Sequence, residues 1–344
     1  MWRHWCGRVH KWLGLGLSLW IVLVSLTGTL LLYKTELLQL TYPQLQLSQL
    51  PTQADAAKVF NRFDAGYAFL PREDKPWIEV VDAGGTTHYF DAHGDEILAR
   101  PMLGDWISWA VEFHHHLLLE ELGKNLMGIM GLLSLVLVVA GLVRWWPRNW
   151  SRRVLAVRWR SPGSRQFQAT LWQFHRSAGV VAFIPILVLL LTGTAIMYAS
   201  AVNSSLATLL PHAVQSTKPA LPAVRALNWQ QRMAVAKRYW PAQEPRLVYL
   251  APQTDGSFRM RLKHMHEWHP NGRSYLTFAE NGSLQTADDV RRRSVGYQVA
   301  QMIYPVHIAY VGGLWWFLLA LAGGVVLLAL PVTGVWFWLK RGGR

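Results

Sequence analysis

Four long runs without a charged residue divide the chain, at 12–33, 125–143, 177–199 and 305–339. Each run has close to, or more than, the roughly 20 residues that a helix needs to cross the hydrocarbon layer of a membrane. The pattern therefore predicts four transmembrane helices. The first run has no small-residue cleavage site after it, so we interpret it as a retained helix and not as a signal peptide.

In the polar segments between the runs, hydrophobic residues recur with the spacing of strands and of amphipathic helices. In the first, residues 75–82 and 86–91 alternate around a glycine turn, and residues 54–63 have helical spacing. In the second, residues 246–250, 257–264 and 273–278 have the composition of strands. We expect two small α+β domains joined to an α-helical membrane protein of four transmembrane helices.

Charge then orients these helices. The net charge is +14, but all 20 acidic residues fall between Glu36 and Glu121 or between Glu244 and Asp289, while the basic loop at 144–165 contains none. Basic loops remain on the cytoplasmic side of bacterial membranes. We expect both termini in the cytoplasm, two periplasmic domains, contact of the basic loops with lipid, and no nucleic-acid partner. The first outer segment is acidic and the second basic, so they either dock together or the second attracts an anionic ligand.

The single cysteine, Cys6, excludes an internal disulfide, a cysteine-based metal cluster and covalent haem attachment through a Cys-x-x-Cys-His motif. A haem would have to be held by axial ligands and noncovalent contacts alone.

The chain also repeats itself. At an offset of 165, His10 falls on His175 and Thr27-Gly28 falls on Thr192-Gly193; at an offset of 193, His114 falls on His307 and Gly141 on Gly334. The molecule is thus expected to consist of two pseudo-symmetric halves, each with a helix, an outer domain and a second helix.

The repeats place the four histidines at helix ends in two matched pairs. His10 and His175 are expected at the cytoplasmic mouths, and His114 and His307 at the outer mouths. Two halves packed around a pseudo-twofold axis bring each pair together, as two axial ligands of one haem iron require. The competing interpretation is that a histidine at a helix end is an ordinary amphipathic interface residue.

Other histidines are weaker candidates. His115 and His116 adjoin His114 and are alternatives to it. His264 and His266 are expected on one face of a strand, where together with His269 they would contact a metal or ligand, although exposed polar strand residues are commoner.

The Thr-Gly pairs at 27–28, 192–193 and 333–334 are interpreted as structural, and the glycines of the same helices either leave room for a porphyrin or allow close helix packing. No nucleotide-binding, zinc-protease or nucleophile motif is present. Electrons would have to come from a partner.

Five motifs together resemble the PepSY-associated transmembrane family over nearly the whole chain: His10-Lys-Trp-Leu-Gly, His114 with the leucines at 117–119, Gly141-Leu-Val-Arg-Trp-Trp, His175-Arg-Ser-Ala-Gly, and His307 with Thr333-Gly334. The family is associated with iron-regulated inner-membrane proteins of Gram-negative bacteria, including ferric-siderophore reductases, and its outer segments are PepSY domains. The resemblance implies two haem b groups held by His10, His175, His114 and His307, and reduction of a ferric siderophore or other ferric chelate in the periplasm. Glu120-Glu121 stands near where relatives often have Leu-Gly.

The expected layout follows the chain. Its parts are the first transmembrane region (1–35), a PepSY-like domain (36–112), the second transmembrane region (113–146), a basic cytoplasmic loop (147–172), the third transmembrane region (173–199), a second PepSY-like domain (200–303), and the fourth transmembrane region with the C-terminus (304–344).

The main hypothesis is an oxidoreductase that receives electrons from a cytoplasmic or quinol donor. The alternatives are a PepSY module without haem that inhibits, chaperones or anchors a periplasmic partner, and a permease. About 30 residues of helix between the two histidine levels give roughly 45 Å, too far for one direct electron transfer, so a relay through Trp20, Trp315 or Trp316, or direct reduction of the outer haem by quinol, is expected.

Overall fold

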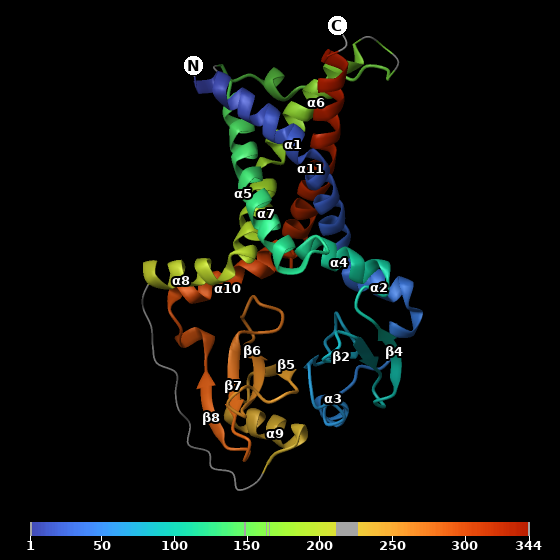
Figure 1. Ribbon diagram of the computed structural model, residues 1–344, viewed down its shortest axis with the longest axis vertical. Helices are drawn as coiled ribbons and strands as arrows, with labels where there is room; N and C mark the ends of the chain where they lie inside the picture. The colour runs from blue at the N-terminus through green and yellow to red at the C-terminus, as the bar shows by residue number, and fades with distance from the viewer. Residues whose placement is uncertain (1, 148, 163, 165, 211–225, 343–344) are drawn as a thin grey trace. The chain divides into compact units, whose positions relative to one another are not determined.

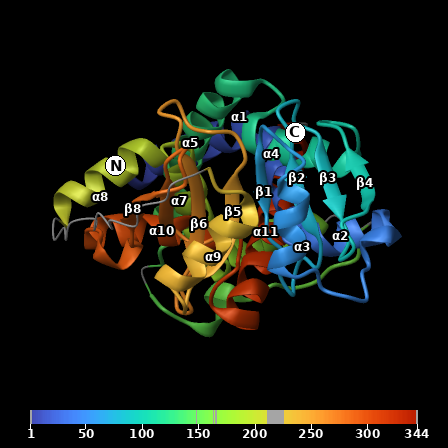
Figure 2. The same ribbon diagram turned by 90° about the horizontal axis from the view of Figure 1, so that it is seen from below.

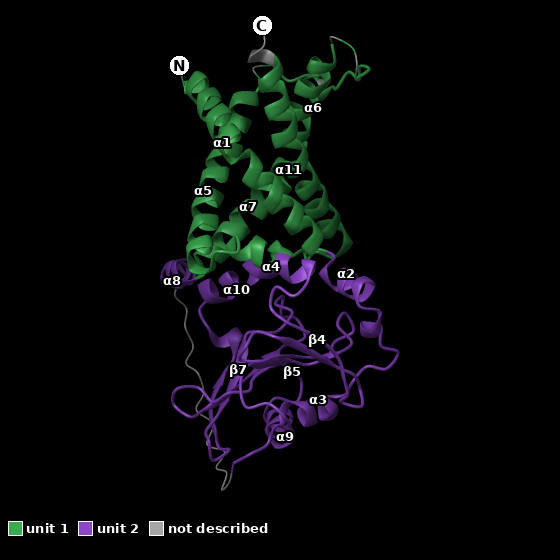
Figure 3. Cartoon of the chain, turned by 45° about the vertical axis from the view of Figure 1, so that its right-hand side comes forward, with its two compact units in different colours: residues 1–32, 110–199, 306–344 green, residues 33–109, 200–305 purple. Residues whose placement is uncertain are grey.

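The computed structural model describes the chain except for residues 1, 148, 163, 165, 211–225 and 343–344 (Figure 1). The chain forms two compact units, each assembled from separated segments (Figure 3). Unit 1 contains residues 1–32, 110–199 and 306–344, and unit 2 contains residues 33–109 and 200–305. Part of the expected second outer domain, 211–225, lies outside the described residues.

Unit 1 is a bundle of apolar helices (Figure 1). Its long helices are α1 (Trp2–Leu31), α5 (Glu120–Trp145), α6 (Phe167–Val181), α7 (Phe183–Met197) and α11 (Gly313–Gly342). Helix α1 packs against α5 and α11, and α7 packs against both α5 and α11. Three helices are long and apolar enough to cross a membrane, and α6 with α7 forms a fourth span if the bent pair is counted as one. The chain is therefore a helical membrane protein with three to four candidate spans.

The break between α6 and α7 bends the chain by 64°. The helix is interrupted at Ala182, three residues before Pro185. Proline has no N–H, and its ring clashes with the carbonyl group four residues before it. That carbonyl belongs to Val181, the last residue of α6, so the position of the break follows from the proline.

Two expected helices are also divided. Residues 113–146 contain the end of α4 (Trp106–His116) and then α5, and residues 304–344 contain the end of α10 (Val295–His307) and then α11. Left-handed backbone occurs at each break, with φ of 52° at Leu117, 49° at Glu120 and 53° at Ala309. His114 and His307 therefore lie on short helices that precede the apolar ones, a correction to the expected layout.

Unit 2 contains one antiparallel sheet of eight strands. The order is β4-β3-β2-β1-β5-β6-β7-β8, so two four-stranded meanders meet at the pairing of β1 with β5 (Figure 2). The strands are β1 (Tyr67–Phe69), β2 (Ile78–Val81), β3 (Thr87–Phe90), β4 (Glu96–Arg100), β5 (Glu244–Tyr249), β6 (Phe258–Lys263), β7 (Ser274–Phe278) and β8 (Leu284–Asp288). The two outer segments, expected as two small domains, share this sheet, because backbone hydrogen bonds join their edge strands.

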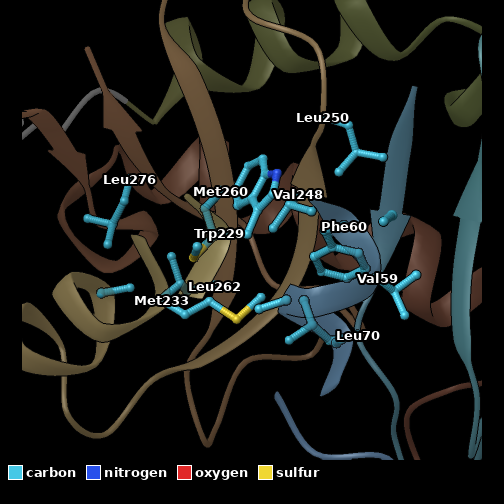
Figure 4. Close-up of a cluster of buried hydrophobic side chains, with 14 of the residues drawn as sticks. Val59, Phe60, Leu70, Trp229, Met233, Val248, Leu250, Met260, Leu262 and Leu276 are labelled. Carbon is cyan, nitrogen blue, oxygen red and sulfur yellow. The ribbon is translucent and has the colours of Figure 1, made fainter. Parts of the chain in front are cut away.

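One face of the sheet is covered by α3 (Gln53–Phe60) and α9 (Trp229–Tyr239). Both helices begin with a capping box, at Thr52 and Asn228, which satisfies backbone N–H groups that the first turn leaves free. Figure 4 shows their side chains, such as Phe60 and Met233, packed with strand residues from both halves in one continuous core. Shared burial of this kind makes the two halves of unit 2 one folded body.

The other face is covered differently in the two halves. Over the first half, α2 (Lys34–Thr41), the short 3₁₀ helix Pro43–Leu45 and the start of α4 form a second apolar cluster around Trp77 and Tyr89. In the second half, this face carries Arg261 on β6 and Tyr275 on β7. The remaining elements are α8 (Ala199–Leu209) and the 3₁₀ helices Arg152–Leu155 and Val290–Arg292.

Candidate functional site

The structure brings His10 and His175 together inside unit 1. His10 lies on α1 and His175 on α6, and the centres of their imidazole rings are 6.1 Å apart with an angle of 79° between the ring planes. The two residues are separated by 165 positions in the chain. The first repeat therefore corresponds to a side-by-side pair in the folded bundle.

A second pair forms from His114 on α4 and His307 on α10. Their ring centres are 6.3 Å apart and the ring planes are inclined by 29°. The two pairs thus have nearly equal ring separations but different relative orientations.

All four rings are fixed by a hydrogen bond at Nδ1. His10 donates to the carbonyl oxygen of Leu137 at 3.0 Å, and the remaining three bonds run from His175 to Leu330 O (3.0 Å), from His114 to Val24 O (3.2 Å) and from His307 to Thr192 Oγ1 (3.0 Å). A neutral imidazole that donates from Nδ1 keeps the lone pair on Nε2. Each histidine therefore offers Nε2 to a ligand, with its ring orientation already set.

A glycine of a neighbouring helix lies against each ring. A Cβ atom on the glycine would approach the imidazole Cε1 to between 2.7 and 3.3 Å in the four cases, which are Gly28 with His114, Gly193 with His307, Gly141 with His10 and Gly334 with His175. Real side chains essentially never tolerate the shorter of these distances. Gly28, Gly141 and Gly193 are required because the ring occupies the space of the missing side chain, and at Gly334 a side chain would fit only if the ring shifted slightly.

Three of these glycines follow a threonine whose hydroxyl reaches the same ring. Thr27 Oγ1 is 3.2 Å from Nδ1 of His114, and Thr333 Oγ1 is 3.1 Å from Nδ1 of His175. Thr192 Oγ1 is 3.0 Å from Nδ1 of His307. Each hydroxyl donates to a carbonyl of its own helix, so its lone pairs accept the imidazole N–H. The Thr-Gly pairs, interpreted from sequence as structural elements of their own helices, hold the histidines of other helices. At the fourth position the threonine is replaced by Ala140, beside Gly141.

These distances fit two imidazoles on one iron. A metal held about 2 Å from each of two opposite ring nitrogens places the ring centres about 6 Å apart, which agrees with the 6.1 and 6.3 Å observed. The donor type also fits, because neutral imidazole is a common axial ligand of haem iron and introduces no charge into an apolar bundle.

Other glycines of the apolar helices divide into two groups. Gly14 and Gly179 lie one turn after His10 and His175, and a Cβ atom there would meet only a leucine at ordinary contact distance, 3.6 Å. Gly128 and Gly131 instead lie tightly against Tyr198 and Thr194, which is the close-packing alternative. Gly14 and Gly179 would therefore accept a small side chain, and close helix packing does not require them.

The two pairs are closer than the sequence suggested. His114 contacts Gly28, which is 18 residues after His10 on α1, a rise of about 27 Å. The expected value of roughly 45 Å assumed that His114 begins the second apolar helix; its position on α4 shortens the path.

The three tryptophans expected as relay residues have different surroundings. Trp20 packs inside the bundle and donates to Met127 Sδ at 3.2 Å. Trp315 is 81% exposed, and Trp316 donates to the carbonyl of Val306.

The neighbours of His114 have other surroundings. His116 Nδ1 is 2.8 Å from Glu112 Oε1, one turn earlier on α4. His115 packs edge-on against both His114 and His116, with ring centres 5.9 Å from each. The ring that lies 6.3 Å from that of His307 is that of His114.

The histidine-rich stretch after β6 differs from expectation. The strand ends at Lys263, so His264 and His266 lie in a turn, and the prediction that they share a strand face is wrong. His264 is within 3.2 Å of Asp289, His266 is exposed, and His269 is buried against Tyr304. Among the described residues, no group of three or more histidine, cysteine or acidic side chains is placed to hold a metal ion.

The fold and the site define a helical membrane protein with interior histidines paired across two internal repeats, joined to an antiparallel sheet. The chain belongs to the family of the PepSY-associated TM region, whose model matches residues 7–341. No curated protein matches the chain.

Proposed function

We propose that this protein is a haem-containing membrane reductase that passes electrons across a bacterial inner membrane to a ferric siderophore or similar ferric chelate. The observation that carries the proposal is the geometry of the two interior histidine pairs, with ring centres 6.1 and 6.3 Å apart and every Nδ1 already hydrogen-bonded. A merely structural histidine requires neither a partner ring at that spacing nor a free Nε2.

His10 with His175, and His114 with His307, would each hold one haem b through Nε2. When bound, haem supplies one-electron transfer through its iron. The protein's part is to fix the rings: the carbonyl and threonine acceptors hold the proton on Nδ1, and the glycines let the rings enter between the helices. Apolar side chains such as Leu17 and Leu137 keep water out of the space between the pairs.

The basic loops support an orientation in which the His10/His175 pair lies near the cytoplasm and the His114/His307 pair near the periplasm. The cytoplasmic pair would receive electrons from a cytoplasmic donor, or quinol would reduce the outer haem directly. Reduction releases iron because the hard oxygen ligands of a siderophore suit Fe(III) and hold the softer Fe(II) far less tightly.

The first experiment is a pyridine haemochrome assay on the purified full-length protein. We expect haem b at two per chain, and loss of about half of it in His10→Ala and in His307→Ala. His93→Ala is the matched control, because His93 is exposed in unit 2 and its removal should leave the haem content unchanged. Purified protein without haem, or full haem content in both ligand variants, would overturn the proposal and favour a PepSY module that acts on a periplasmic partner.

The second experiment measures turnover. Vesicles carrying the protein and an internal reductant are expected to reduce an external ferric chelate, recorded as a coloured Fe(II) complex. His114→Ala should abolish this reduction while leaving the inner haem reducible.

A further inference from the structure

Unit 2 contains a group of arginines that have no ion-pair contact with a carboxylate in the part of the chain that the structure describes. On β6, Met260 and Leu262 point into the shared core, so the alternating Arg261 faces the opposite side of the sheet. Arg261 pairs in register with Tyr275 on β7, and Arg273 stands immediately before that strand. The two guanidinium groups therefore flank one tyrosine.

The hydrogen bonds of this cluster are incomplete. Arg261 donates from Nη2 to the hydroxyl of Tyr275 at 3.0 Å, yet the Nε atoms of Arg261 and Arg273 are both buried without a hydrogen-bond partner. Within the described residues, no carboxylate is in ion-pair contact with either arginine. Glu267 accepts a hydrogen bond from the backbone of His264, and its charge acts on Arg273 without an ion-pair contact. Buried N–H donors of a charged group are costly to leave unmatched, so an acceptor from outside the chain would be stabilised here.

The electrostatic effect of the cluster is visible on its neighbours. Burial lowers the pKa of His269 to about 2, and the positive charges of Arg273, Arg261 and Arg72 act in the same direction. Burial alone would raise the pKa of Tyr275, but Arg261 and Arg273 outweigh it and lower that pKa. Both shifts indicate a local positive potential that would attract an anion.

The first half of unit 2 provides an internal comparison. There Arg100 donates to the hydroxyl of Tyr89 at 2.8 Å, as Arg261 does to Tyr275. Arg100 is also held by both oxygens of Asp105, at 2.7 and 2.9 Å, so its charge is neutralised within the chain. In the second half a tyrosine again accepts from an arginine, but this arginine lies on β6, has no aspartate in ion-pair contact among the described residues, and stands beside a second arginine. Unit 2 thus has a closed ion pair in its first half and an open cationic site in its second.

The open site also has an aromatic neighbour on α10. Tyr304 stacks on His269, with ring centres 5.3 Å apart, and the charge of Arg273 acts on Tyr304.

We propose that Arg261 and Arg273, together with Tyr275, form a binding site for an anionic, oxygen-rich ligand, and that its physiological occupant is the anionic ligand shell of a carboxylate-bearing ferric chelate. The anion site stands on the structure of unit 2, whereas its assignment to an iron chelate rests on the proposed reductase function. Arginine suits such a ligand because its planar group of N–H donors matches the two oxygens of a carboxylate.

The test is isothermal titration of the full-length purified protein with gallium(III) citrate, in which gallium replaces iron and undergoes no reduction. The wild type is expected to bind, more weakly as salt is raised. Arg261→Gln and Arg273→Gln should each weaken binding about tenfold or more, since each removes charged hydrogen-bond donors from the ligand. Arg273→Lys retains the charge but not the fork of donors, so its affinity should fall between those of the wild type and Arg273→Gln.

The matched control is Arg238→Gln. It removes the same charge from an exposed position on α9, the helix that covers the other face of the sheet, and should leave the affinity unchanged. Absence of binding by the wild type, or equal affinity in Arg261→Gln, Arg273→Gln and the control, overturns the site. Haem content is measured on the same samples. If a variant loses gallium citrate binding but keeps its haem, the result concerns the anion site alone. If the protein contains no haem but still binds gallium citrate, the result contradicts only the reductase function.

Discussion

Gly28 lies directly against the imidazole of His114, so that a Cβ atom on residue 28 would stand 2.7 Å from Cε1 of the ring. The glycine belongs to α1, which also carries His10, and the ring belongs to α4. One helix thus supplies a ligand to the inner pair and a seat for a ligand of the outer pair. The two histidine pairs are therefore joined through α1. By the repeat, α6 carries His175 and the adjoining α7 carries Gly193, which lies against His307.

Gly28→Ala is therefore expected to displace the His114 ring. The proposed outer haem would be lost or would change its ligation, and the haem content should fall from about two per chain to about one, while the inner haem remains. Gly16→Ala is the matched control, because Gly16 lies on the same helix and its Cβ would have no atom within 4 Å. Equal haem content in the two variants would show that the ring does not need this space.

The sequence contains enough information to predict the histidine pairs, because a constant offset between repeats identifies equivalent positions. The glycine behind each ring was not predicted, since spacing along a chain does not show which helix faces meet. The breaks after His116 and His307 were missed for another reason: Leu117 and Leu118 adopt left-handed backbone, which leucine rarely does. The pairing of β1 with β5 joins distant strands, and β1 has only three residues, too few for a clear alternation.

The orientation of the rings leads to a spectroscopic prediction. The ring planes are 79° apart in the His10/His175 pair and 29° apart in the His114/His307 pair. The magnetic anisotropy of low-spin ferric haem depends on the angle between its two axial imidazole planes, because that angle sets the splitting of the iron d orbitals. We expect two electron paramagnetic resonance signals, one highly anisotropic from the inner pair and one ordinary rhombic signal from the outer pair.

Ligand variants assign the two signals. His175→Ala should remove the highly anisotropic signal and His307→Ala the rhombic one. A single type of signal in the wild-type protein, or loss of the same signal in both variants, would contradict the ring geometry.

The threonine acceptors should tune the proposed haems. Thr27 Oγ1 accepts from Nδ1 of His114, and a hydrogen bond at this nitrogen makes the imidazole a stronger donor to iron, which stabilises the ferric state. Thr27→Val should raise the outer reduction potential by up to about 60 mV, the equivalent of a tenfold change in a one-electron equilibrium. Redox titration followed by absorbance measures the shift.

Ala140 allows the reverse experiment. It occupies the place of a threonine beside His10, whose Nδ1 is held by the carbonyl of Leu137. Ala140→Thr should lower the inner potential by a similar amount, if the added hydroxyl accepts from Nδ1 as in the other three cases. Shifts of the same sign in Thr27→Val and Ala140→Thr would disprove this role of the hydroxyl, because a general loosening of the bundle would move both in one direction.

The buried Arg100–Asp105 pair should control the stability of unit 2. Burial alone would raise the pKa of Asp105, but hydrogen bonds from Arg100 and from the backbone of Ser108 outweigh it and lower the pKa to about 2. A carboxyl group with a lowered pKa in the folded state stabilises the fold above its unfolded value of about 3.9, and this contribution disappears as the pH falls through the folded value. Thermal unfolding, followed by the fluorescence of tryptophans such as Trp77 in the neighbouring cluster, should therefore shift to lower temperature between about pH 4 and pH 2.

Asp105→Asn removes the charge and leaves Arg100, which is 7% exposed, without its anionic partner. Removing one member of a buried ion pair typically costs about 3–5 kcal/mol, so the variant should unfold at a clearly lower temperature at neutral pH and show a weaker dependence between pH 4 and pH 2. Asp64→Asn, at an exposed position in the same unit, should behave as the wild type. If Asp105→Asn unfolds at the wild-type temperature, the Arg100–Asp105 ion pair does not stabilise unit 2.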